Sequence, residues 1–290
     1  GAFLLSPRVA LKGARQAVSG RGEGRTGQGL ARYPRGAVVP RSVSSPGSGG
    51  EAKEVDVDAL GKYAAAVGVQ FASITAFLAA LDKGLDAVGV ADSVPPAAIG
   101  FLFFILSLRS RVFSPLENRR PDLNKARRGE ETKGFNDRRM PSWTPPGVFF
   151  PIMWILIIAP LRATSSTYLW AAGDHTLCQP AILALMLHLS IGDTWNTINN
   201  VERRLGAAVP GVLSVWLSVL FAVYCYNQAL PTAGTILAPT AVWITVAAAL
   251  VTDTWRINNE GGDEPLYPYK SPSAQTSFWF ESGGAGQDGE

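Results

Sequence analysis

The chain has 290 residues, 47% of them hydrophobic and 17% charged, with a mean hydropathy of +0.13, which is too apolar for an ordinary soluble domain. The formal net charge of +3 carries little information, because the charges are segregated along the chain. Two cysteines and two histidines exclude a disulfide scaffold, a cysteine-rich zinc site and a histidine cluster, and we expect no structural metal and no nucleic-acid partner.

Residues 1–55 are predicted to be a basic arm. The first 50 residues carry eight Lys and Arg residues against one acid, Glu23, and are rich in Gly and Ser. Such a composition is typical of organelle transit segments, and the arm lacks the apolar run of a secretory signal. A disordered basic arm without a targeting role explains the composition equally well.

Residues 56–112 predict a pair of helices. Tyr63–Leu81 is a 19-residue stretch without charge. It either crosses the bilayer or, being only moderately hydrophobic, lies on the membrane or packs on other helices. Ala97–Leu108 is a shorter candidate that ends at Arg109. Residues 113–140 lie in a stretch rich in Lys and Arg and predict a solvated basic loop.

Residues 141–259 predict a membrane bundle of four further helices: Pro146–Trp170, Pro180–Val201, Ala207–Gln228 and Thr235–Arg256. No charged side chain occurs from Gly206 to Thr252, a stretch long enough for two crossings of about 20 residues each. If both early helices also span, nearly all loop Lys and Arg residues fall on one side, and the positive-inside rule then supports six crossings. With one early crossing, only the N-terminus would change sides.

Residues 260–290 predict a polar tail that contains the aromatic trio Phe278-Trp279-Phe280. An aromatic trio on a polar tail suggests docking to a protein or a membrane surface. A tail that folds back on its own bundle explains the trio equally well.

The tryptophans fall into two groups by depth. Helical geometry places four of them too deep for an interfacial aromatic belt: Trp154 and Trp195 at roughly 10 Å from the basic face, Trp216 at roughly 13 Å and Trp243 at roughly 20 Å. Three others lie near helix ends and fit a belt: Trp143, Trp170 and Trp255. Deep indoles from several helices are explained by ordinary packing or by a wall that holds a flat apolar ligand.

Two ionisable side chains are predicted within the spans. Arg162 and His188 come out at nearly the same depth, roughly 22 Å from the basic face. They form one site if Arg162 holds a ligand carboxylate and His188 ligates a tetrapyrrole metal or donates a hydrogen bond. The alternative is that Arg162 extends to the opposite surface and His188 is an internally satisfied core residue.

A polar stripe is predicted on one helix face by Asp193, Asn196 and Asn200, at i, i+3 and i+7. Such a stripe either joins helices by hydrogen bonds or lines a wet cavity. The turn from Glu202 to Gly206 is expected to present charge to lipid headgroups or to a partner. Cys178 and Cys225 are interpreted as two independent thiols near the opposite face.

Three blocks of residues resemble the tryptophan-rich sensory protein / translocator protein family. The first is the start of a helix: Pro141-Ser142-Trp143-Thr144-Pro145-Pro146, with Pro151 and Trp154. The second comprises Trp195, Arg203 and Gly206. The third comprises Leu237, Pro239, Trp243, Ala247, Leu250, Trp255, Arg256 and Asn258. The blocks agree with the family in order and spacing over about 120 residues.

The resemblance implies an all-α polytopic bundle: a five-helix translocator-type core, with Ala97–Leu108 as its first helix, plus an extra N-terminal helix. In the family, the space between these helices holds porphyrins and other flat lipophilic molecules. The candidate ligand-binding residues are therefore Trp143, Pro145, Pro146, Trp154, Arg162, His188, Trp195 and Trp243.

The chain also departs from the family pattern. Gly192 and Asp193 stand where the family usually has an asparagine and a tryptophan, and Leu250-Val251 replaces a Leu-Asn pair. No tyrosine lies between Leu250 and Arg256, so the family's sterol-recognition pattern is incomplete. The chain is identified as a divergent member, for which sterol transport is disfavoured.

The leading hypothesis is an integral membrane binding protein for tetrapyrroles or other flat lipophilic ligands, acting as a sensor, scavenger or carrier. No nucleophile–base pair or phosphate loop is found, so we do not expect an enzyme; porphyrin breakdown would rest on family analogy. No cofactor is expected to be essential, and porphyrin, chlorophyll or carotenoid are the candidate bound groups. The partners expected are the bilayer, a lipophilic small molecule, and a second copy or a larger membrane complex.

The alternative hypothesis is a structural or pigment-binding subunit of a photosynthetic membrane supercomplex. The N-terminal Gly1-Ala2-Phe3 resembles the cleavage-site neighbourhood of proteins imported into plastids of secondary algae, and thus favours an algal source and a thylakoid or envelope membrane. A mitochondrial membrane is the other location considered.

Overall fold

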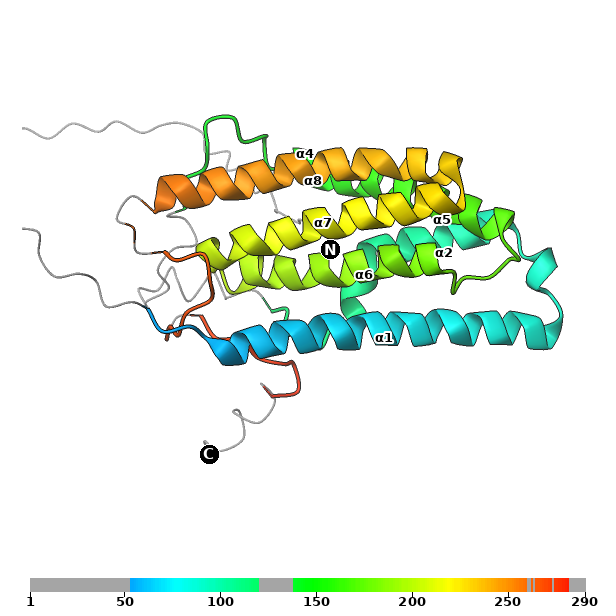
Figure 1. The fold of residues 1–290 in the computed structure, drawn as a ribbon, viewed down its shortest axis with the longest axis horizontal. Coiled ribbons are helices and arrows are strands. Elements are labelled where there is room, and N and C mark those ends of the chain that lie inside the picture. Colours follow the sequence, from blue (N-terminus) through cyan, green and yellow to red (C-terminus); the bar gives the residue numbers. More distant parts are fainter. Residues whose placement is uncertain (1–52, 120–137, 260–261, 263, 273, 282–290) are drawn as a thin grey trace, which may run out of the picture. The chain divides into compact units, whose positions relative to one another are not determined.

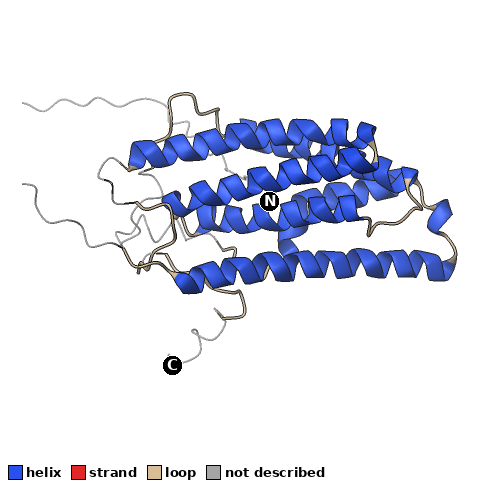
Figure 2. Cartoon of the chain, in the orientation of Figure 1, coloured by secondary structure: helices blue, strands red, loops and turns tan. Residues whose placement is uncertain are grey.

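The computed structural model describes residues 53–119, 138–259, 262, 264–272 and 274–281 (Figure 1). These residues form a bundle of helices without a β-strand, and their only β-type pairings are isolated bridges (Figure 2). The all-α membrane bundle predicted from the sequence is therefore confirmed. The basic arm, most of the basic loop and the far end of the tail lie outside the described residues.

The helices follow the predicted order, and their ends differ from the predicted ones in most cases. The first two are α1 (Val57–Val88) and α2 (Pro96–Arg109), joined by the short turn η1 (Ala91–Ser93), and α2 continues into η2 (Ser110–Phe113). Next comes one continuous helical run made of α4 (Phe149–Ile152), η3 (Met153–Ile158) and α5 (Ala159–Ala172). The rest are α6 (Pro180–Asn196) with η4 (Thr197–Val201), α7 (Leu205–Ala229) and α8 (Pro231–Asn258).

Five helical runs among the described residues are long and apolar enough to cross a membrane: Val57–Val88, Pro96–Phe113, Phe149–Ala172, Leu205–Ala229 and Pro231–Asn258. The run of α6 and η4 lies between α1 and α7 in the bundle and packs against both (Figure 1). The protein is thus an integral membrane protein. The run of α6 and η4 is not among these five, so six crossings remain a prediction from the charge pattern.

Local sequence explains where the helices begin. The Asp56 side chain accepts a hydrogen bond from the Ala59 backbone N–H at 3.0 Å and caps α1. Proline occupies the first position of α2, α6 and α8, where its missing N–H costs nothing. At the other end of α1, Gly89 adopts a left-handed conformation with φ of 70°, which glycine reaches without strain.

Trp170 differs from its predicted place in an interfacial belt. Its side chain is only 1% exposed and belongs to the largest core cluster. The loop after α5 folds over it, so that the indole N–H donates to the His175 carbonyl at 2.7 Å. The belt prediction is wrong for Trp170, because a helix end covered by a loop is not a membrane interface.

Asp193 joins three helical segments. Its carboxyl Oδ2 accepts hydrogen bonds from Gln70 Nε2 on α1 at 2.7 Å and from Ser110 Oγ on η2 at 2.5 Å. All three side chains are at least 95% buried. The helix-joining interpretation of the polar stripe therefore holds at Asp193, which stands where the family usually has a tryptophan.

The turn between η4 and α7 is buried against the tail. Arg204, only 4% exposed, donates to Glu202 at 3.0 Å, to Asp56 at 2.8 Å, and to the backbone carbonyls of Tyr269 and Ala274 at 2.7 and 2.8 Å. The expectation that this turn presents its charges to lipid is wrong for Glu202 and Arg204. Burial opposes the charge on Arg204, but the surrounding acidic groups raise its pKa and keep the guanidinium charged.

The tail folds back on the bundle through part of its aromatic trio. Phe278 pairs with Leu116 in a β-bridge and packs against the buried cluster that contains Ala59 and Tyr63. Trp279 and Phe280 remain 61% and 58% exposed. The fold-back alternative therefore describes Phe278, while the other two rings stay available for docking.

Gly206 is required by the close approach of the tail. A Cβ at this position would lie 1.8 Å from the Pro265 carbonyl oxygen, which belongs to the backbone and cannot rotate away. We expect Gly206→Ala to displace the tail and to cost about 1–3 kcal/mol of stability. Thermal unfolding in detergent and proteolysis of the tail measure this. Gly68→Ala is the control, because its Cβ meets open space; equal behaviour of the two variants would contradict the contact.

Candidate functional site

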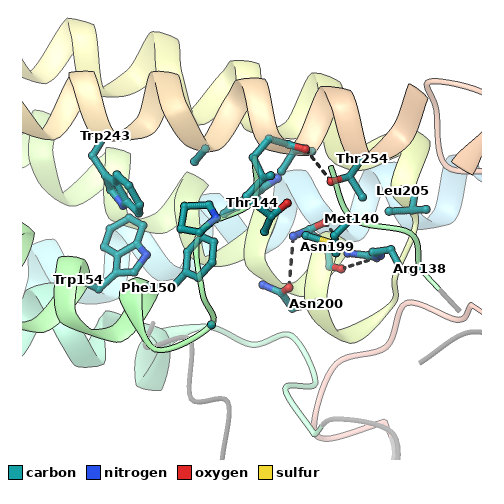
Figure 3. Close-up of a pocket in the computed structure, with 16 residues that line it drawn as sticks. Arg138, Met140, Thr144, Phe150, Trp154, Asn199, Asn200, Leu205, Trp243 and Thr254 are labelled. Atoms are coloured by element: carbon teal, nitrogen blue, oxygen red, sulfur yellow. Dashed lines mark hydrogen bonds between the residues drawn. The ribbon is translucent and has the colours of Figure 1, made fainter. Parts of the chain in front are cut away.

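A cavity of about 330 Å³ lies between the loop residues from Arg138 to Gly147, the start of the η3 helix, the η4 end of α6, and α8 from Trp243 to Thr254 (Figure 3). Most of its lining is apolar. Its volume falls at the lower end of the roughly 300–1,000 Å³ found for small-molecule pockets. Leu205 and Thr254 line it near one end of the bundle.

Three indoles from three helical segments line the cavity: Trp154 on η3, Trp195 on α6 and Trp243 on α8. Trp195 donates to the Ala208 carbonyl at 3.1 Å. Phe149 and Phe150 surround Trp243, with ring centroids at 5.8 and 6.2 Å. The indole N–H of Trp243 is buried and has no acceptor among the described residues. Such a donor usually has a partner in a folded protein.

Both helices on one side of the cavity become π-helical where they line it. In η3, the Ala159 N–H bonds to the Trp154 carbonyl, five residues earlier, and the next residue is Pro160, which has no N–H. In η4, the same type of turn carries Asn199 and Asn200. π-Helical turns are rare and are frequent at functional sites.

The predicted site residues divide into three groups. Pro145, Trp154, Trp195 and Trp243 line the cavity together. Trp143 and Pro146 do not: Trp143 is 45% exposed and donates to Asp253 on α8 at 2.9 Å, while the Pro146 carbonyl accepts from the Phe149 N–H at 2.8 Å. These two residues instead hold the covering loop against α8 and start the helix. Arg162 and His188 lie at a second cavity.

The second cavity is much smaller, about 40 Å³, and shares Trp154 and Trp195 with the first. Arg162 is 3% exposed, so the alternative that it extends to the surface is wrong. Its Nη2 lies 2.7 Å from His188 Nε2. Because arginine only donates, His188 accepts at Nε2, and we assign its proton to Nδ1, 2.9 Å from Ser218 Oγ.

Both ring nitrogens of His188 are therefore bonded to protein groups, and ligation of a metal by His188 would require Arg162 to leave. His188 is thus the internally satisfied core residue of the alternative. The Arg162 guanidinium also lies 5.4 Å from the centre of the Trp154 ring. Across the described residues, no group of three His, Cys, Asp or Glu side chains is placed to hold a metal ion.

Sequence reasoning missed the polar lining of the larger cavity. Arg138, Thr144 and Thr254 line it, as do Asn199 and Asn200. Among these five residues, the sequence analysis had singled out only Asn200, as part of the polar stripe. Arg138 donates to the Asn199 side chain and backbone at 3.5 and 3.3 Å. Burial lowers the pKa of Arg138, against an opposing effect of Glu264.

The fold and the cavity define a helical membrane protein with an aromatic internal pocket. The sequence model of the TspO/MBR family matches residues 123–256. The chain is also similar to Protein CrtK from Rhodobacter capsulatus, 24% identical over 132 residues, which are 46% of this chain and 81% of the relative. It is similar to a tryptophan-rich sensory protein from Cereibacter sphaeroides, 24% identical over 126 residues, or 43% and 76% of the two chains.

These likenesses cover the segment that builds the cavity, and the same segment carries the three sequence blocks described above. The family model and the two relatives support a divergent member of the TspO/MBR family over this segment. α1 and α2 precede the matched residues.

Proposed function

We propose that the protein binds flat lipophilic ligands, tetrapyrroles among them, in the cavity between Trp154, Trp195 and Trp243, and acts as a sensor, scavenger or carrier. The observation that carries this proposal is the set of three indoles from three helical segments around one largely apolar cavity. A flat ligand would present its π faces to these indoles. The buried Trp243 indole N–H, which has no acceptor among the described residues, lies on a residue of the same lining.

Binding rather than turnover fits the lining. Arg138 is the only ionisable side chain among the residues that line the larger cavity, and no nucleophile with an adjacent base occurs there. The cavity is small for a whole tetrapyrrole, so we expect part of the ring to extend through its opening. A porphyrin, chlorophyll or carotenoid is therefore proposed as cargo or signal.

The test is ligand affinity in two cavity variants. Trp154→Leu and Trp243→Leu each remove one aromatic wall, and we expect each to weaken protoporphyrin IX binding by roughly 10-fold or more. Binding is followed by the absorbance of the porphyrin, because the substitutions themselves change the indole fluorescence. Trp216→Leu is the matched control, since Trp216 lies outside the cavity and donates to Thr245 at 2.8 Å. Unchanged affinity in both cavity variants would refute the site.

A pigment-holding or structural subunit of a photosynthetic membrane complex is the second candidate. Helix α1, which precedes the family match, and the exposed rings of Trp279 and Phe280 favour it, because both add surface for a neighbouring protein. A chlorophyll complement that co-purifies with a photosystem would support this function over free ligand binding. We propose a plastid membrane as the location, with a mitochondrial membrane as the alternative, and imaging of the tagged chain in cells distinguishes them.

A further inference from the structure

The larger cavity has two chemically different ends. Trp154 and Trp243 lie at one end, and Arg138 lies at the other with Asn199 and Thr254 (Figure 3). A symmetric hydrocarbon would leave the second end without a partner. A ligand with an apolar body and one polar end matches both.

The polar end has spare hydrogen-bond donors on a positive charge. Arg138 carries five N–H donors, and its bonds to Asn199, at 3.5 and 3.3 Å, are longer than the usual 2.7–3.2 Å. Neither acceptor is charged. Among the described residues, no carboxylate lies within ion-pair distance of Arg138, whereas Arg204 and Arg256 each have one at 3.0 Å or less.

Glu264 does not fill this role. It acts on Arg138 electrostatically, but its two carboxylate oxygens accept from the Gly206 N–H at 3.3 Å and from the Tyr269 hydroxyl at 3.0 Å. The Arg138 guanidinium is thus left to bind a group of a ligand that enters the cavity.

The position of Arg138 along the bundle agrees with an anionic ligand. Arg138 lines the cavity together with Leu205 and Thr254, near the end of the bundle that carries Arg204 and Arg256, which is the basic end. A carboxylate held there stays near the headgroups and water, while an attached ring system lies deeper among the indoles. Burying the acid at the indole end would instead cost its hydration.

We propose that Arg138 binds the carboxylate of the ligand and makes the cavity selective for flat lipophilic acids over their neutral esters; this rests on the function proposed above. Charge-assisted bonds from a guanidinium fork are short, directional and stronger than neutral ones. The preference for acids over esters therefore depends on Arg138. The packing of the ligand ring against the indoles does not.

The experiment compares protoporphyrin IX with its dimethyl ester, which has the same ring and no charge. Binding is measured by porphyrin absorbance with the full chain in nanodiscs of neutral phosphatidylcholine. We expect the wild type to prefer the acid by roughly 10- to 100-fold, and Arg138→Gln to remove that preference while keeping its affinity for the ester. Arg138→Lys should restore part of it. Arg139→Gln is the matched control, because Arg139 is the neighbouring arginine outside the cavity lining.

The outcomes separate this inference from the proposed function. If the wild type binds acid and ester equally, or if Arg138→Gln keeps the preference, the inference is overturned and the binding function stands. If the wild type binds neither, the proposed function fails. Repeating the measurement with phosphatidylglycerol in the nanodisc tests a lipid phosphate as the occupant. Loss of the acid preference only in that membrane would assign Arg138 to a lipid headgroup and overturn the inference.

Discussion

Arg204→Gln is expected to destabilise the folded protein by about 3–5 kcal/mol, because it removes the charge that one buried and one partly buried carboxylate face. Asp56 and Glu202 bond to this guanidinium at 2.8 and 3.0 Å, and the Glu202 side chain is 4% exposed. Burial already raises the pKa of Glu202, and without Arg204 it rises further. The variant also deprives the tail of a donor to the Tyr269 and Ala274 carbonyls.

The measurement is thermal unfolding in detergent, with tail proteolysis as a second readout. Arg256→Gln is the matched control: Arg256 pairs with Asp253 at 2.7 Å, but its side chain is 74% exposed. Exposed pairs contribute about 0–1 kcal/mol, so this variant should remain close to wild type. A similar small effect in both variants would show that the Arg204 network does not hold the tail.

Asp193→Leu is expected to loosen the attachment of α1 to the bundle and to cost about 2–4 kcal/mol. Leucine accepts no hydrogen bond, so Gln70 Nε2 loses a partner at 2.7 Å and Ser110 Oγ one at 2.5 Å. The residues of α1 should then exchange amide hydrogens faster.

Asp193→Asn provides the comparison. The amide oxygen still accepts from both donors, so most of the attachment should survive while the charge is lost. Hydrogen exchange of α1 and the thermal midpoint are measured for both variants. Equal losses with asparagine and leucine would assign the role of Asp193 to its charge rather than to hydrogen bonding.

Much of the fold follows from hydropathy. All the predicted helices form, because apolar runs bounded by charge are a strong signal in a chain with few charges. The ends are less accurate: Tyr63–Leu81 was expected, and α1 runs from Val57 to Val88. Hydropathy registers only the part that faces lipid, and Lys62 and Asp82 belong to turns of the same helix that extend past it.

The cavity was partly predictable. Depth along each helix separated Trp154, Trp195, Trp216 and Trp243 from an interfacial belt, and the family resemblance selected Trp154, Trp195 and Trp243 as pocket residues. The structure places these three around one cavity. Arg138 was missed, because a run of charges without periodicity gives no sign of which arginine turns inward. The burial of Trp170 was also missed, because it depends on a loop that covers the residue and not on its own helix.

The contacts of Arg204 could not be predicted, because they join distant parts of the chain. Its partners are 148 residues earlier, at Asp56, and 65 and 70 residues later, at Tyr269 and Ala274. No local pattern encodes such distances. A match to one segment of a family cannot supply them either, since Asp56 and both tail residues lie outside 123–256.

The same three-way contact has a consequence for biosynthesis. During translation, Tyr269 and Ala274 emerge after α1 and α7, so the guanidinium of Arg204 acquires these two acceptors only after all the membrane helices of the bundle have been made. A chain that stops before Tyr269 leaves a buried cation with two donors unfilled.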